Sequence, residues 1–295
     1  MFHTIMFSGG ANYAAAFVGC IRYLEHIGLR HAARRLVGSS AGALIALLTA
    51  LGLSSDEMRA WSMELAEVHL MNKISLDSAL DLYEMCGIDT GEHLLNAVKA
   101  TLAKYGFADE RDPTFKDLAQ KTGNDLFVCV LNLSSQQFEY LSVDTTPHMS
   151  VALAVRMSMS LPVMFTPVHY NGNVYVDPVL GRNFPYDFPG RTPQTDSGVL
   201  GLYVSGTRTN TLKNPHCAFQ GFILALMAVV VDQSNNHADK HAFRMVNVEI
   251  ADCAAKFDVA TMAFTWTPEI ISHLAKSGYA EAKRVLQDYA NPASH

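Results

Sequence analysis

The chain has 295 residues, of which 49% are hydrophobic, and its formal net charge is −6. An acidic chain without a Lys/Arg cluster does not favour nucleic acid as a partner, because a surface that tracks phosphates needs concentrated positive charge. Its 5 cysteines show no C-x-x-C spacing. This pattern indicates neither a disulfide framework nor a zinc site, and it predicts a reducing compartment. Because no Pro/Gly/Ser-rich linker divides the chain, we expect a single domain over residues 1–295.

The chain begins with an apolar segment, Thr4 to Phe7, that predicts a first strand. No basic region precedes this strand, so the N-terminus does not resemble a secretory leader. The longest apolar run, Gly221 to Val231, is much shorter than the roughly 20 residues that a membrane-spanning helix requires, and it predicts a buried helix. The sequence therefore leaves the compartment open, with cytoplasmic residence as the default expectation.

A loop of small residues follows the first strand and leads into a helix expected over about 13–26. Such a loop can point several backbone N–H groups, helped by the helix dipole, at a developing negative charge. We therefore expect Gly9, Gly10, Ala11 and Asn12 to form an oxyanion hole. The alternative interpretation is an ordinary turn between a strand and a helix.

The stretch Gly38-Ser39-Ser40-Ala41-Gly42 reads G-x-S-x-G, directly after the apolar pair Leu36-Val37 and directly before the helical run Ala43 to Leu51. This context is typical of a nucleophile elbow, in which a strand turns sharply into a helix and lifts a serine hydroxyl out of the sheet. Small residues are needed on both sides of such a turn. Ser40 is therefore the candidate nucleophile.

Strands and helices alternate through much of the remaining chain. The expected helices cover about 55–70, 76–86, 90–105, 149–160 and 271–286. The expected strands cover 126–131, 138–143, 199–204 and 245–250, and Asn171-Gly172 predicts a type I′ turn in a hairpin over 168–176. This alternation predicts an α/β fold, a three-layer α/β/α sandwich with a mostly parallel central sheet.

A single carboxylate, Asp177, stands where the second strand of this hairpin ends. Strand ends are where sheet proteins assemble their sites. Taken alone, an aspartate before Pro178 is more typical of a turn-forming residue.

The chain resembles the patatin-like phospholipase family along nearly its whole length. The glycine-rich loop and the G-x-S-x-G stretch are similar to that family's oxyanion loop and nucleophile elbow. Two later blocks, 156–167 and 177–185, also resemble family motifs. Weaker similarity extends through 114–118 and 271–286. The order and spacing of all the blocks together are far more specific than any one of them.

The resemblance implies a patatin-like variant of the α/β-hydrolase architecture and a Ser-Asp catalytic dyad, with Ser40 as nucleophile and Asp177 as general base. It implies a lipid acyl hydrolase that cleaves fatty-acyl esters through an acyl-enzyme, without a metal or organic cofactor. The expected partners are a lipid or ester substrate and a membrane surface contacted transiently. A carboxylate is a weak base at its ordinary pKa of about 4, so the mechanism needs Asp177 to be buried.

The chain departs from the family pattern at several positions. Ala11, Tyr13 and Ala14 stand where the family usually has a glycine, a basic residue and another glycine. Alanine in a left-handed conformation costs about 1 kcal/mol. The resemblance favours phospholipid as the substrate, and the missing cation adds neutral esters as an alternative. Pro178 follows the aspartate where Gly or Ala is usual, which fixes φ and removes one N–H donor.

Other interpretations remain open at this stage. A Ser-Asp-His triad would need a histidine that follows Asp177 in the chain. The candidates, none of which lies in a motif, are His216, His237, His241 and His273. The apolar residues of 55–88 form either a lid or an acyl groove, or they pack on the sheet as an ordinary amphipathic helix. The alternatives to hydrolysis are a lipid-binding protein that keeps the fold with weak or no catalysis, and an acyltransferase.

Overall fold

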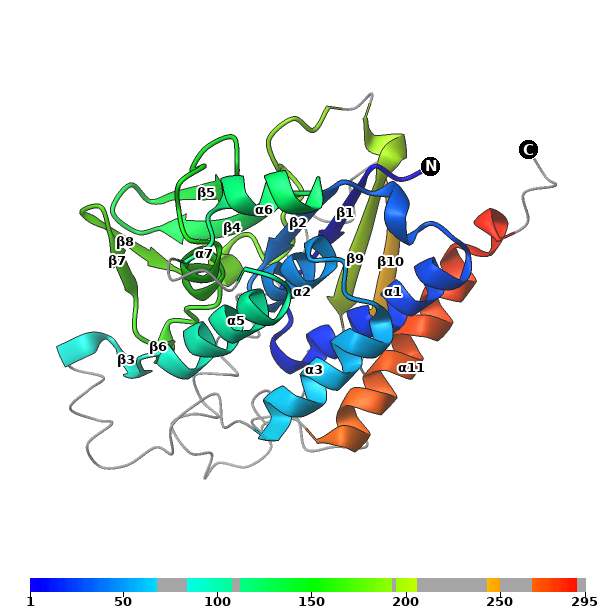
Figure 1. The fold of residues 1–295 in the computed structure, drawn as a ribbon, viewed down its shortest axis with the longest axis horizontal. Coiled ribbons are helices and arrows are strands. Elements are labelled where there is room, and N and C mark those ends of the chain that lie inside the picture. The colour runs from blue at the N-terminus through cyan, green and yellow to red at the C-terminus, as the bar shows by residue number, and fades with distance from the viewer. Residues whose placement is uncertain (68–83, 108–111, 193–194, 206–242, 250–266, 291–295) are drawn as a thin grey trace.

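The computed structural model describes residues 1–67, 84–107, 112–192, 195–205, 243–249 and 267–290. These residues form a central sheet with helices packed against it (Figure 1). Its strands lie in the order β10-β9-β1-β2-β4-β8-β7, and β5 pairs with β4. Their bounds are β1 Thr4–Phe7, β2 Arg35–Ser39, β4 Asp125–Asn132, β5 Gln137–Leu141, β7 Val168–Tyr170, β8 Asn173–Val176, β9 Val199–Ser205 and β10 Arg244–Glu249.

Strands β10, β9, β1, β2 and β4 pair in parallel. Strands β5 and β8 pair with β4 antiparallel, and β7 pairs antiparallel with β8. The central strands have few exposed residues on either face; Met6 and Phe7, neighbours on β1, are both fully buried. Burial on both faces is typical of parallel strands. The predicted mostly parallel sheet is confirmed.

The helices of the described residues are α1 Ala15–His26, α2 Ala41–Ala50, α3 Ser55–Glu67, α5 Glu92–Lys104, α6 Phe115–Thr122, α7 Val151–Ser158 and α11 Pro268–Val285. Their buried apolar side chains join one core cluster with the face of the sheet that carries Ile5 and Leu36. On the opposite face, Met6 and Phe127 pack with Phe184, which belongs to a segment without α-helix. Within the described residues, the sheet therefore has its α-helices on one face and a segment without α-helix on the other.

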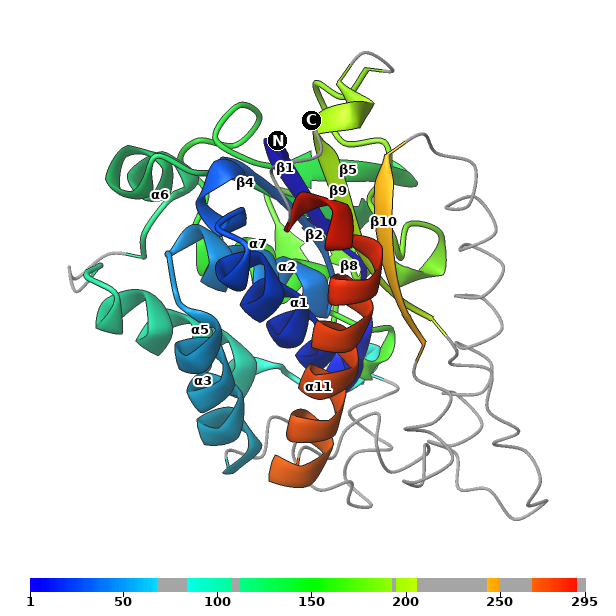
Figure 2. The same ribbon diagram turned by 90° about the vertical axis from the view of Figure 1, so that its right-hand side faces the viewer.

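Helices α1 and α11 run side by side in front of the sheet (Figure 2). A Cβ atom placed on Gly19 of α1 would lie 1.8 Å from the carbonyl oxygen of Ala275, and one placed on Gly278 of α11 would lie 1.9 Å from that of Ala16. The two glycines therefore bring the backbones of the helices into direct contact.

The hairpin turn is confirmed, because Asn171 and Gly172 have φ values of 47° and 77°, both left-handed as a type I′ turn requires. The helix expected over 13–26 begins earlier, as a 3-10 helix over Ala11–Ala14 that continues into α1. The helix expected over 76–86 lies mostly outside the described residues, and the apolar run 221–231 lies wholly outside them.

Two features were not predicted from the sequence. Helix α6 begins with a capping box in which Thr114 and Asp117 exchange hydrogen bonds. Strands β3 Gly87–Asp89 and β6 Val163–Phe165 form a separate parallel pair.

The apolar residues of α3 that were considered for a lid are better explained by packing on the sheet. Leu65 is buried in the core, and Met63 packs against the same core with part of its side chain exposed. Within the described ranges, no helix is long and apolar enough to cross a bilayer.

Candidate active site

The turn from β2 into α2 carries Ser40 and depends on two glycines. A Cβ atom on Gly38 would lie 2.4 Å from the Cα of Ala43, and one on Gly42 would lie 2.3 Å from the carbonyl oxygen of Ser8. Ser40 itself has φ 53° and ψ −130°. Such a conformation costs a non-glycine residue about 1–3 kcal/mol and needs surrounding contacts to hold it. The chain thus makes the sharp strand-to-helix turn expected at Ser40.

A buried serine, Ser158, supports the backbone at this turn. The N–H of Ser40 donates to Ser158 Oγ at 2.8 Å. The Ser158 hydroxyl in turn donates to the carbonyl oxygen of Cys129 at 2.6 Å. Ser158 is fully buried at the end of α7. It therefore ties the strained turn to the middle of the sheet.

Strand β4 brings Ser40 and Asp177 together, although they lie 137 positions apart in the chain. Ser40 follows Ser39, which pairs with Cys129 of β4, and Asp177 follows Val176, which pairs with Leu131. Both residues therefore lie beside the same position of β4, Ser40 on the side of β2 and Asp177 on the side of β8. Their side chains meet above the sheet, where Ser40 Oγ donates to Asp177 Oδ2 at 2.5 Å.

The Asp177 carboxylate is fixed by a second contact. It caps a short 3-10 helix, Pro178–Leu180, and its Oδ1 accepts the N–H of Val179 at 2.9 Å. Pro178 occupies the first helical position, where a missing N–H costs nothing because that N–H has no intrahelical partner. The proline that departs from the family pattern is thus compatible with an Asp177 side chain directed at Ser40.

Burial changes the proton affinity of this carboxylate. Asp177 is 1% exposed. Desolvation raises the pKa of Asp177 to about 7, against the opposing effect of the hydrogen bonds from Ser40 and Val179. A carboxylate with an ordinary pKa near 4 is a weak base, whereas a pKa near 7 matches that of histidine. Within the described residues, no histidine contacts this carboxylate, whose hydrogen-bond partners are Ser40 and Val179.

The glycine-rich loop passes directly beside Ser40. A Cβ atom on Gly9 would lie 3.2 Å from the Cβ of Ser40. The Gly9 N–H donates to the carbonyl oxygen of Asn183 at 2.8 Å. In the part of the chain that the structure describes, the N–H groups of Gly10 and Ala11 donate to no protein acceptor. Ala11 has φ 44°, so it adopts the left-handed conformation that glycine would adopt without strain.

Arg156 ties the end of α7 to the small β3–β6 sheet. Arg156 is 3% exposed, and its guanidinium donates to the carbonyl oxygens of Thr90 at 2.7 Å and Thr166 at 3.1 Å. Burial lowers the pKa of Arg156 to about 10. The same guanidinium donates to the Ser160 hydroxyl, and the Ser160 carbonyl accepts the N–H of Asp177 at 3.0 Å. Arg156 thus supports the backbone next to Asp177.

The structure brings Ser40, Asp177 and Gly9 together, with Gly10 and Ala11 next along the loop. Asn12 is buried on the 3-10 helix that follows, and His273 lies on α11. The other three histidines considered for a triad lie outside the described residues: His216, His237 and His241. Ser158 belongs to none of the motifs predicted to be catalytic, although it lies within the 156–167 block that carries the family resemblance.

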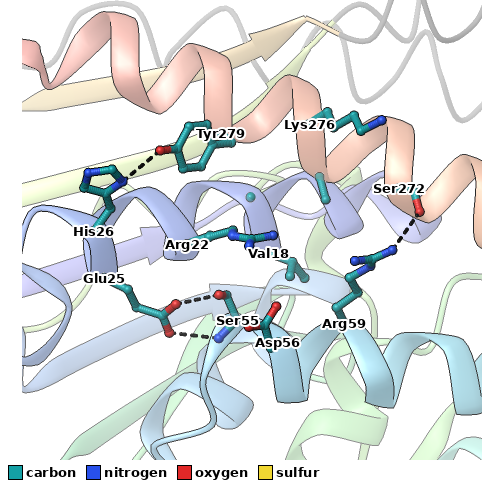
Figure 3. Close-up of a pocket in the computed structure, with 12 residues that line it drawn as sticks. Val18, Arg22, Glu25, His26, Ser55, Asp56, Arg59, Ser272, Lys276 and Tyr279 are labelled. Atoms are coloured by element: carbon teal, nitrogen blue, oxygen red, sulfur yellow. Dashed lines mark hydrogen bonds between the residues drawn. The ribbon is translucent and has the colours of Figure 1, made fainter.

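A groove of about 730 Å³ lies elsewhere, between α1, α3 and α11 (Figure 3). The carboxylate of Glu25 accepts two hydrogen bonds from Ser55, one from the N–H at 2.8 Å and one from the hydroxyl at 2.5 Å. The hydroxyl of Tyr279 forms a hydrogen bond with Nδ1 of His26 at 3.0 Å. Neither Ser40 nor Asp177 lines this groove. It is therefore separate from the candidate active site.

Replacing Ser158 with alanine is expected to lower kcat about tenfold with little change in KM. The variant leaves the Ser40 N–H without its acceptor, which loosens the strained turn, and destabilises the protein by about 1–3 kcal/mol. Steady-state ester hydrolysis and urea unfolding measure the two effects. Ser62→Ala is the matched control, because Ser62 is also a buried helix serine but donates only to Met58. An unchanged kcat in Ser158→Ala would contradict this role.

The chain has relatives among curated proteins. Residues 5–188 match the family described as Patatin-like phospholipase. "Probable lipid hydrolase 463L" of Invertebrate iridescent virus 6 is 25% identical over 189 residues, which are 63% of this chain and 62% of that protein. An uncharacterized protein of Acanthamoeba polyphaga mimivirus is 27% identical over 288 residues, covering 95% of this chain and 92% of that one. The chain thus spans less than two thirds of the first viral relative.

Solved structures share the fold. VipD of Legionella pneumophila superimposes with a TM-score of 0.57 at 18% identity, covering 98% of this chain and 67% of VipD. ExoU of Pseudomonas aeruginosa, in its complex with SpcU, gives a TM-score of 0.51 at 18% identity, covering 97% of this chain and 53% of that one. Since the family match covers more than half of the sequence, this chain belongs to the patatin-like phospholipase family.

Proposed function

We propose that this protein is a lipid acyl hydrolase in which Ser40 attacks a fatty-acyl ester and Asp177 is its general base. One observation carries the proposal. Ser40 Oγ lies 2.5 Å from an oxygen of a buried carboxylate whose pKa is raised to about 7. A serine hydroxyl is a weak nucleophile until an adjacent base removes its proton, and among the described residues Asp177 is the base in contact with Ser40 Oγ.

In the first half of the proposed reaction, Ser40 Oγ attacks the ester carbonyl while its proton passes to Asp177 Oδ2. The carbonyl oxygen becomes an oxyanion, which is stabilised by the N–H groups of Gly10 and Ala11, both without a protein acceptor among the described residues. Gly9 contributes mainly by lacking a side chain beside Ser40, because its N–H is occupied by Asn183. Collapse of the intermediate breaks the ester bond, and protonated Asp177 returns the proton to the departing alcohol oxygen.

In the second half, water attacks the acyl-enzyme. Asp177 accepts a proton from the water, and the same N–H groups hold the second oxyanion. The bond to Ser40 Oγ then breaks, the serine regains its proton from Asp177, and a fatty acid leaves. The products are a fatty acid and a lyso-lipid or another alcohol.

The family and the viral relative favour a lipid ester as the substrate class. Tyr13 stands where the family usually carries a cation, and it is buried on the 3-10 helix that follows the loop. Without that cation, the site attracts an anionic headgroup less strongly, so we include neutral esters among the proposed substrates. Transfer of the acyl group to an alcohol acceptor uses the same acyl-enzyme and is distinguished by its products.

Activity is expected to rise with pH and to level off above about pH 8. Only ionised Asp177 accepts the serine proton, and its pKa is raised to about 7. Below about pH 6, kcat/KM should fall roughly tenfold per pH unit. Initial rates on an uncharged ester between pH 5 and 9 test this. A profile that stays flat down to pH 5 would contradict the raised pKa.

Labelling with a fluorophosphonate tests the proposed nucleophile directly, since the probe reports an activated serine whatever the natural substrate. The wild type should gain one adduct, measured by intact mass and located at Ser40 by peptide mapping. Ser40→Ala should gain none. A wild type that stays unlabelled but retains a bound lipid would indicate a lipid-binding protein. Products formed with added glycerol or a lyso-lipid would separate transfer from hydrolysis.

A further inference from the structure

The segment 181–188, which follows Asp177 closely in the chain, contacts both other parts of the candidate site. The carbonyl oxygen of Arg182 accepts the hydroxyl of Ser39, the neighbour of Ser40, at 2.9 Å. The next carbonyl oxygen, that of Asn183, accepts the N–H of Gly9 at 2.8 Å. Two successive peptide groups therefore join the serine turn to the glycine-rich loop.

The side chain of Asn183 lies against the loop as well. Asn183 is 3% exposed. A Cβ atom on Gly9 would lie 2.4 Å from Asn183 Oδ1 and 3.2 Å from the Cβ of Ser40. The Cα of Gly9 is thus enclosed between the Asn183 amide and the serine. A Cβ atom on Gly10, in contrast, would have no heavy atom nearer than 3.7 Å.

Contacts outside the site keep the 181–188 segment in place. The guanidinium of Arg182 lies 5.1 Å from the ring centre of Phe138 and 4.6 Å from that of Tyr186. It also pairs with Asp187 at 2.8 Å, and Asp187 accepts the hydroxyl of Tyr140 at 2.6 Å. Stacking and ion pairing together hold the segment against β5. These contacts fix the position of the 181–188 segment, and with it the position of Asn183 next to Gly9.

We infer that Asn183 is a positioning residue, which holds the glycine-rich loop at the separation from Ser40 that oxyanion binding requires. The inference rests on the proposed function. Gly10 and Ala11, whose N–H groups are the proposed donors, directly follow the residue that Asn183 holds. Ala11 is in a left-handed conformation that the loop would otherwise relax. Without the Asn183 side chain, the main-chain hydrogen bond to Gly9 remains, but the Cα of Gly9 loses the amide packed against it. The donors then lose their alignment while Ser40 and Asp177 keep theirs.

Asn183→Ala is expected to lower kcat about tenfold to a hundredfold and to slow fluorophosphonate labelling of Ser40 by a similar factor, because both reactions need the oxyanion donors. KM should change less than about threefold, and the midpoint of the pH profile should stay in place, because Asp177 is untouched. Asn132→Ala is the matched control. Asn132 is also a buried asparagine, but its side chain accepts the N–H groups of Ser134 and Ser135 and donates to Glu139 and Tyr175, without contact to the glycine-rich loop among the described residues. This control should lose stability without losing kcat.

A second readout does not depend on activity. Gly9→Ala should lower the thermal midpoint, because its new methyl group meets Asn183 Oδ1, and Gly10→Ala should lower it less. The double variant Gly9→Ala with Asn183→Ala should lose less stability than the sum of the two single losses. Unchanged kcat and labelling in Asn183→Ala would overturn the positioning role. A double variant whose loss equals or exceeds that sum would overturn the contact itself, even if the wild type proved inactive and the proposed function failed.

Discussion

Asp177→Asn is expected to lower kcat/KM by about a thousandfold or more while making the protein more stable above pH 7. The loss of activity follows from the loss of the base, since an amide cannot accept the proton of Ser40. The side chain keeps its shape, so its carbonyl oxygen can still accept the N–H of Val179. The substitution therefore removes the proton acceptor without emptying the space that it occupies.

The gain in stability follows from the sign of the pKa shift. The folded protein holds the Asp177 proton more tightly than the unfolded chain, because burial raises the folded pKa from 3.8 to about 7. The free energy of unfolding therefore falls as pH rises from about 4 to about 7 and stays low above that range. The charged, buried carboxylate costs a few kcal/mol at pH 8. The neutral amide avoids that cost.

Urea unfolding of Asp177→Asn and wild type at pH 4 and pH 8 measures this difference. The variant should be about 2–4 kcal/mol more stable at pH 8 and equal to wild type at pH 4. Ser40→Ala is the control for activity, because it removes the nucleophile and leaves the carboxylate ionisable. An Asn variant that is less stable than wild type at both pH values would contradict the raised pKa.

Gly278→Ala is expected to destabilise the protein by about 3 kcal/mol, although the same change inside an exposed helix usually stabilises it by about 1 kcal/mol. The new methyl group would lie 1.9 Å from the carbonyl oxygen of Ala16. Backbone atoms cannot turn aside as a flexible side chain can, so α1 and α11 have to separate. The aromatic and aliphatic contacts along their interface weaken with that separation.

Thermal and urea unfolding followed by circular dichroism measure this effect, and a fall in Tm of about 6–12 °C is expected. Ser277→Ala, one position earlier on α11, is the matched control. Its hydroxyl donates only to the carbonyl of His273 in the same helix, so its loss should cost less than about 0.5 kcal/mol. A stable Gly278→Ala would mean that the helices are farther apart than the structure has them.

The sequence predicted the parallel sheet well, because its central strands are short apolar runs that alternate with amphipathic helices. It could not predict β3 and β6, since three-residue strands are too short to show a period of two residues. Helix α6 could have been found, because Thr114 and Asp117 have the spacing of a capping box.

The candidate site was predictable where a motif or the family resemblance identified it, as at Ser40 and Asp177. The separation of the two in the chain gives no sign of their contact, which depends on how the strands on both sides of β4 are aligned. Ser158 and Asn183 act through backbone groups of other segments. Their contribution depends on which distant segments pack together in the fold, and no local sequence pattern predicts that packing.

The fixed orientation of Asp177 has a consequence for the order of events in the proposed reaction. One oxygen is held by the N–H of Val179, so only the other faces Ser40. The departing alcohol and the incoming water must therefore use the same carboxylate oxygen in turn. Water can be activated only after the alcohol has left, and an alcohol that stays re-forms the ester. The balance between hydrolysis and acyl transfer would then be set by how quickly the first product leaves.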